Sequence, residues 1–216
     1  MSLRIFSASL TLGTLTLSPF AHAQITIYKD ESLFLAATGA TSVEGFESLS
    51  PRARLDTPIV TPSFTVTPDP GLIGVQDTPI FGAHATEGTK FLLVYRENQV
   101  SGIRIDLNAP TRIFGFTITD WNDGSGGGIL SLRTNVGEAQ GTVVLDNPTP
   151  GFPNGNEHFY GIVQDTPFTQ VFLSDTVLDD AFGIDAVRTN AVPAPGAFAT
   201  LLIGAVPGLF LLRRRK

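Results

Sequence analysis

Apolar and polar residues alternate with a period of two along most of the chain, in short stretches separated by Gly, Pro, Asn and Asp. This period is typical of strands that bury one face. The predicted strands are 25–28, a stretch from 42 onward, 63–67, 72–75, 90–95, 102–107, 112–120, 129–134, 139–145, 158–163, 169–174 and 183–189. Many short strands joined by turn residues predict a mainly β fold, namely a single antiparallel β-sandwich of the jelly-roll type.

A helical pattern occurs near the start of the body. Asp30 can cap the first turn, Glu31 suits the positive end of a helix dipole, and Phe34 falls on its apolar face. One short N-terminal helix is therefore predicted over 30–37. Residues 49–62 are rich in Pro and Arg, and we expect them to form a long loop.

Phenylalanine occurs sixteen times. Eight copies lie within or beside the predicted strands: Phe46, Phe64, Phe91, Phe114, Phe116, Phe159, Phe172 and Phe182. Buried aromatic side chains supply much of the apolar area between packed sheets. We interpret these residues as core rather than as a binding stripe.

The first residues have the pattern of a secretory signal peptide. Arg4 supplies a positive charge, and residues 5–20 are mainly apolar or small hydroxyl residues. Ala21 and Ala23 form a small-x-small cleavage site. We therefore expect residues 1–23 to be removed from the mature chain.

The C-terminal residues, 190–216, fall into three parts. A motif at 192–197 contains Val192, Pro193, Ala194, Pro195 and Gly196, the apolar segment 196–212 follows, and the tail is Arg213, Arg214, Arg215 and Lys216. An apolar stretch of about 17 residues is at the short end of the range that spans a bilayer. Clustered Lys and Arg resist translocation. We therefore predict a transmembrane helix with its basic tail in the cytoplasm and the body outside.

This order of parts resembles the PEP-CTERM sorting signal of Gram-negative bacteria, in which a Val-Pro-Glu-Pro-like motif precedes a transmembrane helix and an Arg-rich tail. Ala194 stands where the commonest motif has Glu. The resemblance implies that a membrane-embedded exosortase reads the signal and cuts near the motif. The helix would then anchor the protein in the inner membrane before processing, and the body would reach the cell surface or extracellular space.

A plain C-terminal anchor and a buried core helix are the alternatives for this segment. Pro207 argues against an undisturbed helix. Four consecutive cations at the end of the chain argue against a helix buried in a soluble core.

The predicted body, 24–189, is strongly acidic. Five of the fourteen Lys and Arg residues lie in the targeting segments, whereas all twenty Asp and Glu residues lie in the body, which gives the body a formal net charge of −11 against −6 for the whole chain. Such a surface repels nucleic acid, which excludes nucleic-acid binding as a main role. The chain has no Cys, so the body folds without disulfides, and its length suits one domain.

Three stretches of the body resemble strands of PEP-CTERM proteins: 43–47, 158–163 and 182–187. The first contains a Phe-Glu pair and the last a Gly-Ile-Asp sequence. In related jelly rolls, such as carbohydrate-binding modules and MAM-like domains, the equivalent Glu and Asp often hold a structural calcium ion. The resemblance implies that Glu47 and Asp185 are calcium ligands.

The calcium hypothesis has limits that the sequence itself shows. Ca²⁺ takes six to eight oxygen ligands, of which Glu47 and Asp185 supply two side chains. The second Asp of the family motif is Ala186 here. The alternative is that both acids are solvated carboxylates, or are paired with Arg188 or Arg52.

The loop that contains the only Trp of the chain is the stretch most like a binding site. Trp121, Asn122 and Asp123 are the candidate ligand-binding residues, because an aromatic ring can stack on a pyranose while amide and carboxylate groups bind its hydroxyls. The alternative, which we favour, is a hairpin loop whose Trp packs onto the sheet.

Catalytic motifs are scarce. His84 and His158 are the only histidines of the body, and no nucleophile-elbow, phosphate-loop or metalloprotease motif occurs. We predict a non-catalytic module associated with exopolysaccharide or the cell envelope. The alternatives are a glycosidase-like hydrolase, with two carboxylates about 5–10 Å apart in a cleft, and a purely structural matrix component.

Overall fold

The computed structural model describes residues 24–39, 41–69, 71–95, 102–123, 128–136, 142–148, 151–176 and 180–191. The predicted signal peptide, the sorting motif, the transmembrane segment and the basic tail lie outside the described residues. Within those ranges, no helix has both the length and the apolar character needed to cross a membrane.

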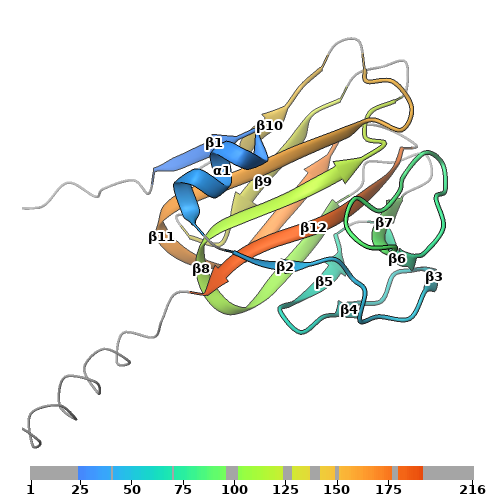
Figure 1. The fold of residues 1–216 in the computed structure, drawn as a ribbon, viewed down its shortest axis with the longest axis horizontal. Helices are drawn as coiled ribbons and strands as arrows, with labels where there is room; N and C mark the ends of the chain where they lie inside the picture. The colour runs from blue at the N-terminus through green and yellow to red at the C-terminus, as the bar shows by residue number, and fades with distance from the viewer. Residues whose placement is uncertain are drawn as a thin grey trace, which may run out of the picture.

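The described residues form a mainly β structure with one short helix (Figure 1). In chain order the elements are β1 (Ile25–Tyr28), α1 (Glu31–Thr38), β2 (Ser42–Glu44), β3 (Arg52–Leu55), β4 (Ile59–Val60), β5 (Phe64–Pro68), β6 (Leu72–Gln76), β7 (Phe91–Tyr95), β8 (Gly102–Thr119), β9 (Leu130–Thr134), β10 (Val143–Asp146), β11 (Glu157–Asp175) and β12 (Ala181–Ala191). All the pairings between these strands are antiparallel.

Two long strands, β8 and β11, run side by side through both layers of a sandwich (Figure 1). The first part of β8 and the last part of β11 belong to one layer, with β4, β5, β9 and β10. The last part of β8 and the first part of β11 belong to the other layer, with β1, β2, β12, β7, β6 and β3. Each layer therefore continues into the other through the same two strands.

The passage between the layers coincides with a proline in each long strand. Pro110 lies in β8 and Pro167 in β11, and the regular pairing of the two strands is interrupted between Val163 and Phe168. Proline has no N–H for a ladder, so it is tolerated where the ladder is already broken. The sequence pattern predicted one strand before and another strand after each of these prolines. That prediction was wrong, because the chain bends there without ending the strand.

The predicted loop 49–62 contains β3 and β4, which the sequence analysis missed. β3 pairs with β6 at the edge of one layer, and β4 pairs with β5 at the edge of the other. Both are short, and β3 carries Arg52 and Arg54. Short, charged edge strands have a weak sequence signal because neighbouring strands, rather than their own apolar pattern, hold them in place.

The main core lies between the two layers and is rich in aromatic side chains. Of the eight phenylalanines predicted to be core, the buried ones are Phe46, Phe64, Phe91, Phe114, Phe116, Phe159 and Phe182. Phe172 is half-buried, and the guanidinium carbon of Arg133 lies 3.7 Å from the centre of its ring.

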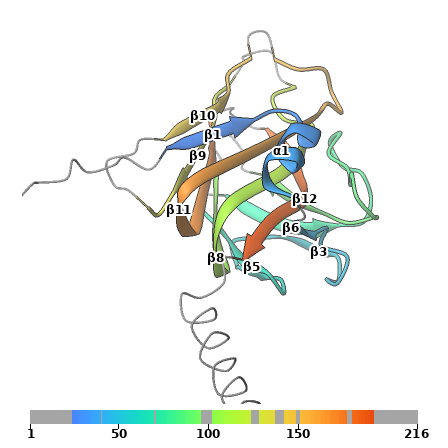
Figure 2. The same ribbon diagram turned by 60° about the vertical axis from the view of Figure 1, so that its left-hand side comes forward.

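The helix α1 covers the outer face of one layer, where it lies against β11 in both views (Figure 1 and Figure 2). Its N-cap is Asp30, whose Oδ1 accepts a hydrogen bond of 2.9 Å from the Leu33 amide, as the sequence predicts. Phe34 is fully buried beneath the helix. Its ring sits on Gly115 and Gly161, which face each other on adjacent strands.

We expect Gly161→Ala to destabilise the protein, because a Cβ at this position would lie 2.5 Å from Cδ2 of Phe34. Overpacking of this kind costs about 1–3 kcal/mol. Urea unfolding of the variant measures the loss. In a Phe34→Leu background the same glycine substitution should cost less, and an equal cost in both backgrounds would contradict the proposed contact.

Candidate functional site

The hollow with the most site-like lining lies where several strands begin or end. It has a volume of about 390 Å³. Its lining residues are Phe81, Tyr95, Asp120, Asp123, Asn154, Asp180 and Ala181. We call it the acidic pocket. It forms because β12 pairs with β7 on one side and β8 on the other, which brings the ends of β7 and β8 beside the start of β12.

Two stacked aromatic rings form one wall of the acidic pocket. The rings of Phe81 and Tyr95 lie with their centres 6.1 Å apart and their planes at 19°. Phe81 is 54% exposed, so its ring is accessible from solvent. The guanidinium carbon of Arg54 lies 4.5 Å from the Tyr95 ring centre and 5.3 Å from that of Phe81, which fixes the pair from the side of β3.

Two of the three carboxylates are held by backbone amides. Asp180 accepts hydrogen bonds from the amides of Asn122, at 2.7 Å, and Ala181, at 2.8 Å. Asp120 accepts one from the Gly155 amide. Asp123 is half-buried, and within the described part of the chain its side chain makes no hydrogen bond or ion pair. Asp123 is therefore the carboxylate with its oxygens open to a ligand.

The environment of the pocket raises the pKa of two of these acids, Asp120 and Asp180. Burial, as the largest cause, and the charges of Asp123 and Asp120 together raise the pKa of Asp180 to about 6. Burial also raises the pKa of Asp120, and Asp123 adds to this shift. The three carboxylates therefore repel one another within one pocket, which favours protonation or a cationic ligand.

The backbone around the acidic pocket adopts rare conformations. Phe81, Asp120 and Asn122 have φ values of 55°, 59° and 57°. Asp and Asn tolerate this left-handed region, whereas for Phe it is a strained conformation. Gly82, with φ of 96°, is required beside the Asp120 carboxylate because a Cβ there would collide with it. Strain that clusters at one hollow is a common property of functional sites.

The predicted trio of ligand-binding residues is split by the fold. Trp121 is fully buried, and its Nε1 donates a hydrogen bond of 3.0 Å to Asp175 Oδ1. Its ring packs against Phe152 and Tyr160 in the interior. The hypothesis that Trp121 stacks on a sugar is therefore wrong, and the favoured alternative of a packed Trp agrees with its position.

The other two members of the trio differ from each other. Asn122 is fully buried, and its side-chain amide has no hydrogen-bond partner among the described residues. Asp123 lines the acidic pocket. The aromatic side chains that line this pocket together with Asp123 are Phe81 and Tyr95, and not Trp121. No sequence signal joined these residues to the loop, since they lie on segments far from it in the chain.

Glu47 and Asp185, the predicted calcium ligands, both bind the loop that precedes β7. Asp185 Oδ2 accepts hydrogen bonds of 2.7 Å from the amides of Thr86 and Glu87. Glu47 Oε1 accepts bonds of 2.7 and 2.6 Å from the amides of Thr89 and Lys90. The first and last parts of the body therefore meet at one loop.

The donor set around Asp185 fits a cation in part. Asp185 is fully buried, and its Oδ1 has no hydrogen-bond partner among the residues that the structure describes. Oδ1 and the Glu87 carbonyl oxygen each lie 3.6 Å from the point where Gly45 would carry a Cβ, so two oxygens flank the same space. Glu47 is exposed, and the amides of Thr89 and Lys90 lower its pKa. Among the described residues, no group of three acidic, His or Cys side chains is arranged to hold a metal ion.

Among the described residues, Arg188 and Arg52 bind other partners and do not pair with Glu47 or Asp185. Arg188 pairs with Glu31 of α1. Arg52 donates to the Thr57 hydroxyl, at 2.6 Å, and to the carbonyl oxygen of Pro58, at 3.2 Å.

The two histidines of the body differ in environment: His158 packs against aromatic rings, whereas the contacts of His84 are polar. His158 is half-buried with its ring centre 3.9 Å from that of Phe152, and burial lowers its pKa. His84 lies near the acidic pocket, where its Nδ1 is 2.9 Å from the Gly82 carbonyl oxygen and its amide donates to the Thr119 hydroxyl.

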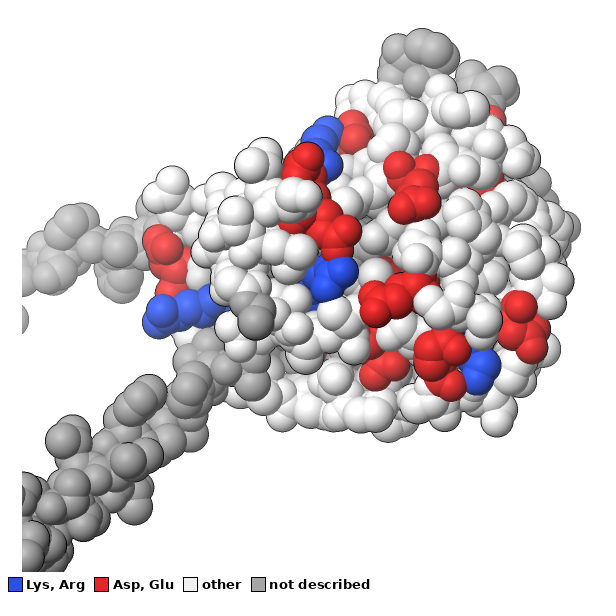
Figure 3. All heavy atoms as spheres, viewed as in Figure 1, with Lys and Arg blue, Asp and Glu red and all other residues white. Residues whose placement is uncertain are grey.

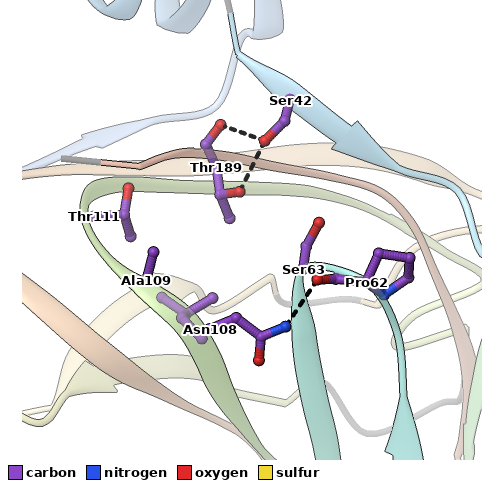
Figure 4. Close-up of a pocket in the computed structure, with 8 residues that line it drawn as sticks. Ser42, Pro62, Ser63, Asn108, Ala109, Thr111 and Thr189 are labelled. Carbon is purple, nitrogen blue, oxygen red and sulfur yellow. Dashed lines mark hydrogen bonds between the residues drawn. The ribbon is translucent and has the colours of Figure 1, made fainter. Parts of the chain in front are cut away.

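A second hollow, of about 180 Å³, lies beside the end of β12 (Figure 4). Its polar groups already bind one another: the Ser42 hydroxyl donates to the Thr189 carbonyl oxygen, at 3.0 Å, and the Asn108 amide donates to the Pro62 carbonyl oxygen, at 2.8 Å. The described residues that line it carry no charge. It therefore offers a ligand less than the acidic pocket does.

Comparison with known proteins gives only distant matches. No protein-family model matches the chain, and the curated proteins contain no relative that matches it. Among solved structures, the cleaved adhesin domain of Lys-gingipain is 13% identical in sequence, with a TM-score of 0.40. The match covers 71% of this chain and 99% of that domain. A family 29 carbohydrate-binding module is 11% identical, with a TM-score of 0.41, and the match covers 70% of this chain and 92% of the module. A family 22 xylan-binding domain is 14% identical, with a TM-score of 0.40, and the match covers 71% of this chain and 95% of the domain.

We expect the Asp180 carboxylate to make stability depend on pH. Its pKa is raised to about 6 from an ordinary value of 3.8, so the folded state binds this proton more tightly than the unfolded state. The resulting stabilisation is complete below about pH 4 and is lost as the pH rises through about 6. Asp180→Asn removes this dependence, and the variant should gain stability relative to the native protein, by roughly 1–3 kcal/mol, between those limits.

Urea unfolding of both proteins across this pH range measures that difference. Asp165→Asn, at an exposed carboxylate outside the pocket, controls for the loss of one charge. A stability difference between the native protein and Asp180→Asn that does not change with pH would show that Asp180 has no raised pKa.

Proposed function

We propose that this protein is a non-catalytic β-sandwich module that binds polysaccharide at the acidic pocket. The observation that carries the proposal is the exposed Phe81 ring, stacked on Tyr95 at the edge of a hollow lined by carboxylates and the Asn154 amide. A pyranose presents an apolar face, which packs on aromatic rings, and a rim of hydroxyl groups. Carboxylate and amide oxygens accept hydrogen bonds from such hydroxyls.

We also propose that the module acts outside the inner membrane. The signal peptide at 1–23 supports export through the secretion machinery, and the order of parts in 190–216 supports sorting by an exosortase. The C-terminal helix then anchors the protein in the inner membrane until processing, after which the body is associated with exopolysaccharide or the cell envelope. The acidic surface of the body, on which red side chains predominate in Figure 3, suits a hydrated extracellular setting.

A carboxylate-dependent hydrolase is the second candidate, because Asp120 and Asp180 line the same pocket and both have raised pKa values. A raised pKa suits a general acid. Binding is the better supported function, since backbone amides already hold oxygens of both carboxylates. Release of reducing sugar ends by the native chain, lost in Asp180→Asn, would favour the hydrolase instead.

We expect Phe81→Ala to weaken binding of the full chain to oligosaccharides by about tenfold or more, because truncating a central aromatic contact removes at least about 1.4 kcal/mol of binding free energy. A glycan array with neutral, amine-bearing and uronic acid oligosaccharides identifies ligands, and titration calorimetry measures the loss.

Leu33→Ala is the matched control for this test, since Leu33 is 63% exposed on α1 and does not line the pocket. It should bind like the native chain. Equal binding by native chain and Phe81→Ala would remove the acidic pocket as the sugar site. Absence of any glycan signal would favour a purely structural matrix role.

We further propose a structural calcium ion at Asp185, with the Glu87 carbonyl and Glu47 among its ligands. The supporting observation is the buried and unpaired Oδ1 of Asp185. Such an ion would tie the last strand to the loop before β7, and it would supply no chemistry at the acidic pocket.

We expect Ca²⁺ to raise the midpoint of thermal unfolding relative to chelator, because a ligand bound only to the folded state stabilises it by mass action. Asp185→Asn should abolish the calcium response, whereas Asp165→Asn should retain it. A native midpoint that is the same in calcium and in chelator would remove Asp185 and Glu47 as metal ligands.

A further inference from the structure

We propose that the acidic pocket selects amine-bearing sugar units, such as those of a de-N-acetylated hexosamine chain, over neutral sugars and uronic acids. This inference rests on the proposed function, since it names the class of polysaccharide that the same pocket takes. The observation that supports this inference is that three carboxylates and two aromatic rings line one hollow.

The first step is the charge of the lining. Of the described residues that line the acidic pocket, Asp120, Asp123 and Asp180 are carboxylates, and none carries a positive charge. Arg54 stacks on Phe81 and Tyr95, and His84 interacts electrostatically with Asp120, but neither is a lining residue. The pocket therefore has a negative field that a protein cation does not neutralise from within.

The second step is the hydrogen-bonding capacity that remains. Backbone amides use oxygens of Asp120 and Asp180, whereas the Asp123 side chain has no hydrogen bond with the described chain. Ionised carboxylates only accept hydrogen bonds, and an ammonium group only donates them. Asp123 is thus placed to bind an ammonium directly, with the other two carboxylates as neighbours that strengthen its field.

The third step is the match to a sugar rather than to a free cation. Phe81 and Tyr95 offer stacked ring faces at the same hollow, and ring faces attract both the apolar side of a pyranose and a nearby cation. A 2-amino sugar carries both features within one ring. A uronic acid would bring a fourth negative charge into the pocket, and a neutral sugar would leave the mutual repulsion of the carboxylates in place.

The experiment compares glucosamine oligomers with N-acetylglucosamine oligomers of equal length, by titration calorimetry with the full chain. The two probes differ only at the 2-nitrogen, which is a free amine in one and is acetylated and uncharged in the other. We expect the amine-bearing oligomer to bind at least about tenfold more tightly, as charge-assisted hydrogen bonds are roughly twice as strong as neutral ones. The preference should shrink only modestly as salt is added, because salt screens a partly buried charge pair less than an exposed one.

Asp123→Asn is the decisive variant, because its side chain makes no described contact whose loss would unfold the protein. It should remove the preference for the amine, because the affinity for the glucosamine oligomer should fall to about that for the acetylated oligomer. Asp165→Asn, which removes the same charge at an exposed position outside the pocket, should keep the preference.

The remaining outcomes separate this inference from the proposed function. Equal affinity for both oligomers, lost in Phe81→Ala, would overturn the selectivity and leave sugar binding intact. No affinity for either oligomer or for neutral and uronic acid chains would overturn both. A lysine oligopeptide that binds as tightly as the glucosamine oligomer, with the same sensitivity to Asp123→Asn, would mark a site for cationic peptides and overturn the sugar assignment.

Discussion

The continuous pairing of β8 with β11 is the interaction on which the rest of this structure depends. The two strands share a ladder on both sides of their prolines, so one pair of strands supplies the centre of both layers. The core aromatic residues then face one another across the space that the bend creates. Because β12 adds to the last part of β8, the start of β12 is fixed against the ends of β7 and β8. The acidic pocket exists because of that convergence.

Carboxylates that accept hydrogen bonds from backbone amides position the loops around the place where β7, β8 and β12 meet. Asp185 and Glu47 hold the loop before β7, Asp180 holds the turn after β8, and Asp120 holds the turn before β11. A carboxylate can accept several amide hydrogen bonds at once, and each is stronger than a bond between neutral groups. The acidity of the body is therefore partly structural. It also leaves a surplus of negative charge, part of which gathers in one pocket.

The same arrangement separates two roles that the sequence joined in one loop. Trp121 supplies apolar volume to the core, and its indole N–H finds a buried carboxylate, so it stabilises the end of β8. Its neighbours Asp120 and Asp123 face the hollow together with Phe81 and Tyr95. A rigid core residue beside carboxylates that line a hollow limits how far those carboxylates can move.

The sequence by itself determined the local elements of this protein. Period-two alternation located most strands, Asp30 indicated the start of the helix, and the phenylalanines within or beside predicted strands identified much of the core, because each of these signals is local to a short segment. Only the tertiary structure decided that strands continue through Pro110 and Pro167, that Trp121 points inward, and that Phe81, Asp123 and Asp180 meet at one hollow. Those outcomes depend on contacts between segments far apart in the chain, and a local pattern contains no information about which distant segment will be its neighbour.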